Sequence, residues 1–147
     1  MIKRTIPIIV ILILLSIIIS LSVFYSISYQ RKIRPITNKA IYSVGDDLRI
    51  KIRNTLKDRI CFSTCYPYYF EREKEEGIWE GLSYPPCATK DLIGRCLDSK
   101  ATKFFETKIP VLEKGKYRLA IPLCINCKEG KEFNPEIWLY SNEFIIK

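Results

Sequence analysis

The chain has 147 residues, with 24 Lys or Arg against 16 Asp or Glu, and its formal net charge is +8 at pH 7. It contains no histidine, which excludes a Ser–His or Cys–His nucleophile pair and any imidazole metal ligand. No Gly-rich phosphate-binding loop occurs either. We therefore expect a non-catalytic protein without a cofactor.

The N-terminal segment is an uncharged run from Thr5 to Gln30. At about 1.5 Å per helical residue, its apolar part from Ile6 to Ile27 spans the roughly 30 Å hydrocarbon core of a bilayer. A cleaved signal peptide is the alternative, but its apolar core normally has only about 7–15 residues. We predict one transmembrane helix within residues 1–30, followed by a basic juxtamembrane link at residues 31–35.

All cysteines of the chain lie in the remaining part, residues 36–147. They are Cys61, Cys65, Cys87, Cys96, Cys124 and Cys127. An even number of cysteines in a short exported domain predicts disulfides, because an oxidising compartment preserves them. The basic residues on the two sides of the apolar run are balanced, so charge does not orient the chain. From the cysteines, we expect a single-pass cell-membrane protein whose C-terminal domain is extracellular.

The apolar pattern of this domain has mostly period two. Leu48, Ile50 and Ile52 alternate with basic residues, which predicts a half-buried strand with a basic outer face. Further predicted strands are Ile60–Ser63, Tyr68–Lys74, Ile78–Glu80, Lys103–Ile109, Lys116–Leu123 and Ile137–Ile146. The segment Gly81–Lys100 is predicted as an irregular crossover with a helical turn at Leu92–Leu97. About seven short strands in one domain predict an all-β sandwich.

Four separated motifs then appear in a particular order. They are Tyr42-Ser-Val-Gly-Asp46 before an alternating strand ending at Asn54, Gly77-Ile-Trp79, Gly115-Lys-Tyr-Arg-Leu119, and Tyr140-Ser-Asn-Glu-Phe-Ile-Ile146. This order resembles the immunoglobulin-like domains of prokaryotic membrane-anchored surface proteins. The resemblance implies an immunoglobulin-like antiparallel β-sandwich over residues 36–147. The chain departs from antibody domains at Leu119, where a cysteine would stand.

Three aromatic residues are predicted to be structural. Tyr117 begins a strand after a Gly turn, so we expect its ring in the core and its hydroxyl bonded to nearby backbone. Trp79 and Trp138 are interpreted as core or hairpin aromatics, although Trp can also anchor a partner interface.

The pair Cys124-Ile-Asn-Cys127 allows a turn disulfide, half of a zinc site or a redox dithiol. The redox reading is disfavoured because the pair follows a predicted strand and not a helix start. A zinc site would need Cys61 and Cys65 as well. These two are poor disulfide partners, because four residues of one strand span about 13 Å. We expect the middle loop to be joined to a sheet through Cys87 or Cys96.

The basic excess is local, with nine Lys or Arg and three acidic residues in residues 31–59. Residues 60–147 carry thirteen of each. This pattern is typical of a solvated strand face next to a membrane, or of attraction to anionic headgroups or an acidic polymer. The basic residues lack interleaved stacking aromatics, so a nucleic acid partner is not expected.

These features predict a non-catalytic, membrane-anchored binding, adhesion or structural module of the cell envelope. Its expected partners are the membrane and an envelope protein or anionic polymer. Two alternatives remain from the sequence. One is a protease inhibitor that presents the loop Gly81–Lys100, and the other is a four-cysteine metal- or thiol-handling module.

Overall fold

The computed structural model describes residues 11, 13–21 and 32–147, and the chain divides into two compact units, residues 1–31 and 32–147. In the first unit, residues 13–21 form an α-helix whose side chains are all exposed. Within the described part of the chain, no helix combines the length and apolar character that crossing a membrane requires. Most of the predicted transmembrane segment, residues 6–27, lies outside the described residues.

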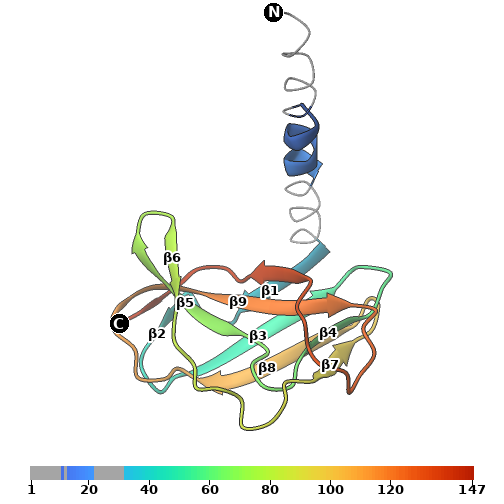
Figure 1. The fold of residues 1–147 in the computed structure, drawn as a ribbon. Coiled ribbons are helices and arrows are strands. Elements are labelled where there is room, and N and C mark those ends of the chain that lie inside the picture. The colour runs from blue at the N-terminus through green and yellow to red at the C-terminus, as the bar shows by residue number, and fades with distance from the viewer. Residues whose placement is uncertain (1–10, 12, 22–31) are drawn as a thin grey trace, which may run out of the picture. The chain divides into compact units, whose positions relative to one another are not determined.

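The second unit is built from strands, which confirms the all-β prediction (Figure 1). The strands are β1 (Ile33–Thr37), β2 (Ile41–Tyr42), β3 (Asp47–Asn54), β4 (Ile60–Ser63), β5 (Tyr69–Glu75), β6 (Ile78–Gly81), β7 (Ile93–Leu97), β8 (Thr102–Lys108), β9 (Gly115–Ile125), β10 (Ile137–Tyr140) and β11 (Phe144–Ile146). One sheet has the order β1-β3-β8, and the other has the order β2-β11-β9-β4-β7. In the second sheet β10 and β5 also pair with β9, and β6 pairs with β5.

Strand β3 forms where the strict alternation predicted it. Leu48, Ile50 and Ile52 are fully buried, while Arg49 and Arg53 between and after them are exposed. β3 pairs antiparallel with β1 on one edge and with β8 on the other. Alternation of this kind gives a sheet one apolar face that must be covered, and the second sheet provides the cover.

The core lies between the two sheets. The Phe62 ring of β4 meets the Phe105 ring of β8 edge to face, with centroids 5.3 Å apart. From β9, Leu119, Ile121 and Leu123 are all fully buried. Burying one such side chain contributes roughly 1.5–3 kcal/mol relative to leaving it in water.

Strand β9 is the centre of the larger sheet. β11 and then β10 follow one of its edges, while β5 and then β4 follow the other. All these pairings are antiparallel, whereas β2 pairs with β11 in parallel. β9 therefore has partner strands along both of its edges, and this arrangement positions the site described below.

Two predictions about the loops were wrong. β7 runs through Ile93–Leu97, where an irregular crossover with a helical turn was expected, and it pairs antiparallel with β4. β1 begins at Ile33, so residues 33–35 belong to the β unit and not to the predicted link at residues 31–35. Ile33 and Pro35 face the core, and pairing with β3 extends the sheet to residues whose local sequence looked like a linker.

The strand predicted over Ile137–Ile146 is interrupted at residues 141–143. There the Ser141 hydroxyl accepts a hydrogen bond of 2.9 Å from the backbone N–H of Leu119. The side chain of Asn142 accepts a hydrogen bond from the N–H of Thr37 at the end of β1. These side chains replace ladder hydrogen bonds, and so one predicted strand becomes the two strands β10 and β11.

Candidate functional site

The side of β9 that faces away from the core carries two small outward residues that are nevertheless buried, Ala120 and Pro122. The strand register explains their burial. Tyr69 of β5 and Tyr140 of β10 lie opposite Ala120, one on each edge of β9. Trp138 of β10 lies opposite Pro122. Large aromatic side chains therefore flank the small residues on this surface.

The rings extend beyond β9 in two groups, which together we call the aromatic face. Tyr66, Tyr69, Tyr84 and Trp138 are in ring contact, and Trp79 and Tyr140 lie against Arg118. The residues of the face come from β5, β6, β9 and β10 and from the loops that follow β4 and β6.

One end of the aromatic face is built around the Arg118 guanidinium. Its central carbon lies 4.3 Å from the ring centroid of Trp79 and 3.9 Å from that of Tyr140. Its Nε lies 2.6 Å from a carboxylate oxygen of Glu71, the residue directly opposite on β5. Cation–π contacts contribute about 0.5–1 kcal/mol at exposed sites and about 2 kcal/mol when desolvated. Arg118 thus holds two rings from different strands in fixed positions.

A second cation supports the same end. The Lys116 ammonium lies 5.7 Å from the Trp79 ring centroid and forms ion pairs with Glu73 at 3.2 Å and Glu143 at 2.7 Å. Hydrogen bonds to these two carboxylates raise the pKa of Lys116. Its positive charge is therefore retained across the physiological pH range.

The other end of the face is a cluster of rings in edge-to-face and tilted contact. Tyr69 lies 5.1 Å from Tyr84 and 5.9 Å from Trp138, measured between ring centroids, and Tyr66 lies 5.0 Å from Tyr84. The Tyr84 hydroxyl accepts a 2.8 Å hydrogen bond from the N–H of Phe70. Burial raises the pKa of Tyr84 to about 12, so it remains a neutral phenol.

Chemically, the aromatic face suits binding. Tyr, Trp and Arg are enriched at the energetically important positions of protein interfaces, and Tyr and Trp bury much area for little lost side-chain entropy. Trp138 is 43% exposed and Tyr140 is also exposed, so both present ring surface to solvent. The mutual contacts of the rings order them before any partner arrives.

The predicted structural residues have different positions. Tyr117 is buried, and its hydroxyl donates a 2.7 Å hydrogen bond to the carbonyl of Glu113, four residues upstream. Burial raises the pKa of Tyr117. Trp79 lies in the β5–β6 hairpin, whereas Trp138 lies on the surface and not in the core.

All six cysteines form disulfides, as the sequence predicted. Cys61 bonds to Cys96 and Cys65 bonds to Cys87, with Cα atoms 4.0 Å and 6.0 Å apart, so both middle-loop cysteines are joined to β4 or the loop after it. The third bond joins the close pair Cys124–Cys127. The four cysteines considered as zinc ligands are therefore all oxidised, and none supplies a thiolate.

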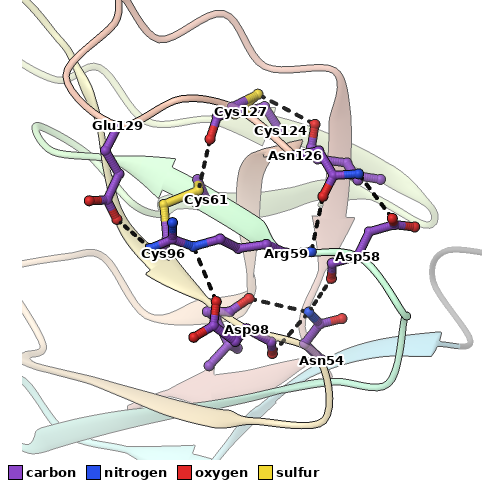
Figure 2. Close-up of a disulfide and its surroundings, with 12 residues drawn as sticks. Asn54, Asp58, Arg59, Cys61, Cys96, Asp98, Cys124, Asn126, Cys127 and Glu129 are labelled. Carbon is purple, nitrogen blue, oxygen red and sulfur yellow. Dashed lines mark hydrogen bonds and ion pairs between the residues drawn. A yellow bond between two sulfur atoms is a disulfide. The ribbon is translucent and has the colours of Figure 1, made fainter.

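Figure 2 shows the surroundings of the Cys61–Cys96 disulfide. The Cys61 sulfur lies 3.8 Å from the carbonyl oxygen of Cys127, which brings the third disulfide beside the first. Arg59 closes this end of the sheet through ion pairs of 3.2 Å to Asp98 and 2.7 Å to Glu129. The cluster is covalently fixed and has a structural role.

Sequence reasoning missed Tyr69, Tyr140 and Arg118 as members of a common surface. A signal was present, because Trp138 and Tyr140 alternate with the buried Leu139, as Tyr69 alternates with the buried Phe70. Marking the outward positions of each predicted strand would have found these rings. Their adjacency across β9 depends on pairings that the sequence does not specify.

Comparison with known proteins adds little. No family model matches the chain, and no curated protein matches it. A solved structure with some likeness is the Pseudomonas fluorescens alkylpurine DNA glycosylase AlkC bound to DNA containing an abasic site analog, with a TM-score of 0.39 and 12% sequence identity. The match covers 79% of this chain but only 30% of the glycosylase chain. A likeness of this size carries no argument about fold or function.

Proposed function

We propose that the protein is a non-catalytic binding module of the cell envelope, anchored in the membrane by its N-terminal segment and exposed on the extracellular side. The observation that carries the proposal is the aromatic face, whose exposed Trp138 and Tyr140 lie beside the ordered Arg118. The uncharged run Thr5–Gln30 supports the anchor. The three disulfides support an oxidising compartment.

An immunoglobulin-like arrangement is part of this proposal. Support comes from the two-sheet division, with β1, β3 and β8 in one sheet and β9 central in the other. Further support comes from the short strand β2. It follows β1 in the chain but belongs to the other sheet, where it pairs in parallel with the final strand β11. The tyrosine that precedes the middle of β9, Tyr117, bonds back to the backbone as the tyrosine corner of such domains does.

The binding mode we propose is a partner that covers the aromatic face. An envelope protein is the favoured partner, because rings packed edge to face offer a ridged surface that suits a folded protein better than a flat polymer. Trp138 and Tyr140 would be the central anchors, and the ion-paired residues Lys116 and Glu73 would form a polar rim.

The test is a cross-linking capture from native membranes that compares the wild-type chain with the double variant Trp138→Ala/Tyr140→Ala. The matched control is Phe104→Ala, which removes another exposed ring from the outer surface of β8, on the other sheet. We expect the wild type and the control to retain the same envelope protein and the double variant to lose it. Equal capture by all three chains, or no captured envelope component, would overturn the proposal.

A second candidate function has one specific observation in its favour. The segment between β6 and β7, residues 82–92, is tethered at Cys87 to Cys65, and β7 is tethered at Cys96 to Cys61. A covalently held, exposed loop is a feature of many protease inhibitors. Titration against a panel of proteases tests this role, and absence of inhibition at micromolar protein would reject it.

A further inference from the structure

A cavity of about 380 Å³ opens near the loop between β4 and β5 and the end of β8. Its size lies near the lower end of the range for small-molecule sites, roughly 300–1,000 Å³. We call it the tyrosine pocket and define it by Tyr66, Tyr68, Tyr84, Arg95, Thr107 and Lys108, which all line it. It lies at the margin of the aromatic face, with which it shares only Tyr66 and Tyr84.

Four residues that line the tyrosine pocket carry a hydroxyl group, namely its three tyrosines and Thr107, whose hydroxyl donates to the carbonyl of Lys108 at 3.5 Å. The Tyr66 hydroxyl donates to the carbonyl of Pro85 and can accept a further hydrogen bond. The Tyr84 hydroxyl accepts from Phe70, and its own proton has no acceptor among the described residues. The Tyr68 hydroxyl makes no hydrogen bond within the described part of the chain. The pocket therefore offers donors and acceptors that a ligand with several hydroxyl groups can use.

The charge of the lining is entirely positive. Arg95 and Lys108 line the pocket, and none of the lining residues is an acid. Lys108 forms a 2.9 Å ion pair with Asp47, but both side chains are highly exposed and such pairs are weak. Arg95 has no ion pair among the residues that the structure describes. The lining therefore favours a ligand with a negative charge.

The position of Arg95 results from an irregularity in β7. The pairing with β4 shifts register between Ile60 and Phe62, and Arg95 adopts a positive φ of 50° at this bulge. Bulges re-aim side chains beside binding sites, and a non-glycine residue at positive φ is a strained feature that accompanies functional positions. At the preceding Gly94 an added Cβ would lie 2.6 Å from the Thr64 side chain, so the absence of a side chain allows the close approach beside the bulge. The backbone is thus arranged to present a cation at this cavity.

We propose that the tyrosine pocket binds an acidic sugar unit, a carboxylate-bearing pyranose of an extracellular polysaccharide. The sugar's C–H faces would contact the tyrosine rings, its hydroxyl groups would bond to the phenols and Thr107, and its carboxylate would pair with Arg95. An acidic peptide could also pair with the cations, and the tyrosine rings favour the sugar because pyranose C–H faces stack on them. This inference rests on the extracellular location in the proposed function but not on the aromatic face as a binding surface, because Trp138 and Tyr140 do not line the pocket.

The test uses the full-length protein in detergent and isothermal titration calorimetry. The probe is a galacturonate oligomer, and the comparison ligands are a neutral galactose oligomer of equal length and a glutamate oligopeptide. We expect the galacturonate oligomer to bind at least tenfold more tightly than either comparison ligand. Equal affinity for the neutral oligomer, or tighter binding of the glutamate peptide, would overturn the proposal.

Variants locate the binding. Arg95→Asn removes the charge but keeps a residue that tolerates positive φ, so we expect the fold to persist and the affinity to fall at least tenfold. Arg95→Lys keeps the charge and should lose about threefold. The matched control Arg53→Asn, on the exposed side of β3, should bind like the wild type. Unchanged affinity in Arg95→Asn contradicts the proposal, and so does loss of binding in Trp138→Ala/Tyr140→Ala.

Discussion

Cys61 of β4 and Cys124 of β9 lie directly opposite each other in the antiparallel register, yet each is bonded to a different cysteine. Both are fully buried and belong to one apolar cluster with Ile93 and Phe133. The two disulfides therefore meet inside the fold but close chain loops of very different length. Cys61 bridges 35 positions to Cys96, whereas Cys124 bridges three to Cys127.

This difference predicts unequal contributions to stability. In the chain-entropy account, a loop of about 35 residues stabilises the folded state by roughly 4 kcal/mol and a loop of about three residues by roughly 1.6 kcal/mol. We expect Cys61→Ala/Cys96→Ala to lower the free energy of unfolding by clearly more than Cys124→Ala/Cys127→Ala does. Denaturant unfolding of each variant, monitored by tryptophan fluorescence, measures the two losses of unfolding free energy. The reverse order would contradict the prediction.

Arg118 orders two rings and one carboxylate of the aromatic face, so its removal should loosen that surface. We expect Arg118→Ala to cost about 1–2 kcal/mol of unfolding free energy, through lost cation–π contacts and an unpaired, half-buried Glu71. Arg118→Lys keeps the charge but lacks the planar guanidinium, so its unfolding free energy should lie between those of the wild type and Arg118→Ala. Chemical unfolding gives the values, and Arg49→Ala on the exposed side of β3 is the control. If both variants match the control, Arg118 does not order the face.

The turn before β3 should respond to acid. Asp46 accepts a hydrogen bond from the N–H of Ser43 and pairs with Lys39, and these interactions lower the pKa of Asp46 below its usual 3.8. A lowered carboxyl pKa contributes stability at pH values above the unfolded value, and this contribution is lost as the pH falls through the folded value. We expect the unfolding free energy of the wild type to fall more steeply below about pH 4 than that of Asp46→Asn. If the unfolding free energies of the wild type and Asp46→Asn fall in parallel with decreasing pH, the prediction is wrong.

Tyr84 supplies the acceptor for the N–H of Phe70, a buried residue of β5. Tyr84→Phe leaves this N–H without an acceptor, so we expect a loss of about 1–3 kcal/mol in unfolding free energy. The control is Tyr68→Phe, which removes a hydroxyl that makes no hydrogen bond among the described residues. Thermal or denaturant unfolding measures the stability of the two variants. An equal effect of the two substitutions would show that the Tyr84 hydroxyl does not stabilise the fold.

The sequence identified strands where one segment carries its own signal. β3 alternates strictly, so Leu48, Ile50 and Ile52 could be assigned to the core without knowledge of any partner strand. β7 could not be found in this way, because Ile93–Leu97 contains Gly94 and a charged Arg95 and becomes a strand only by pairing with β4. β1 was missed for a related reason, since Pro35 looks like linker sequence but is accepted in a strand at the edge of a sheet.

The cysteine analysis predicted that disulfides form and that Cys61 does not pair with Cys65, and the structure has both features. The reason given, distance along one extended strand, does not apply, because β4 ends at Ser63 and Cys65 lies in the loop after it. It could not choose the partners, which depend on how β7 returns to β4. The aromatic face was hidden for the same reason. Tyr69 and Tyr140 are far apart in the sequence and become neighbours only because both pair with β9 at Ala120.

The bond between Cys65 and Cys87 encloses the whole β5–β6 hairpin in a covalent ring. A protease that cut once inside this ring would release no fragment, because both new ends would stay attached through the sulfurs. Such a nick would alter the mobility of the chain on a denaturing gel only after reduction, so digestion followed with and without reductant reports directly on access to the hairpin.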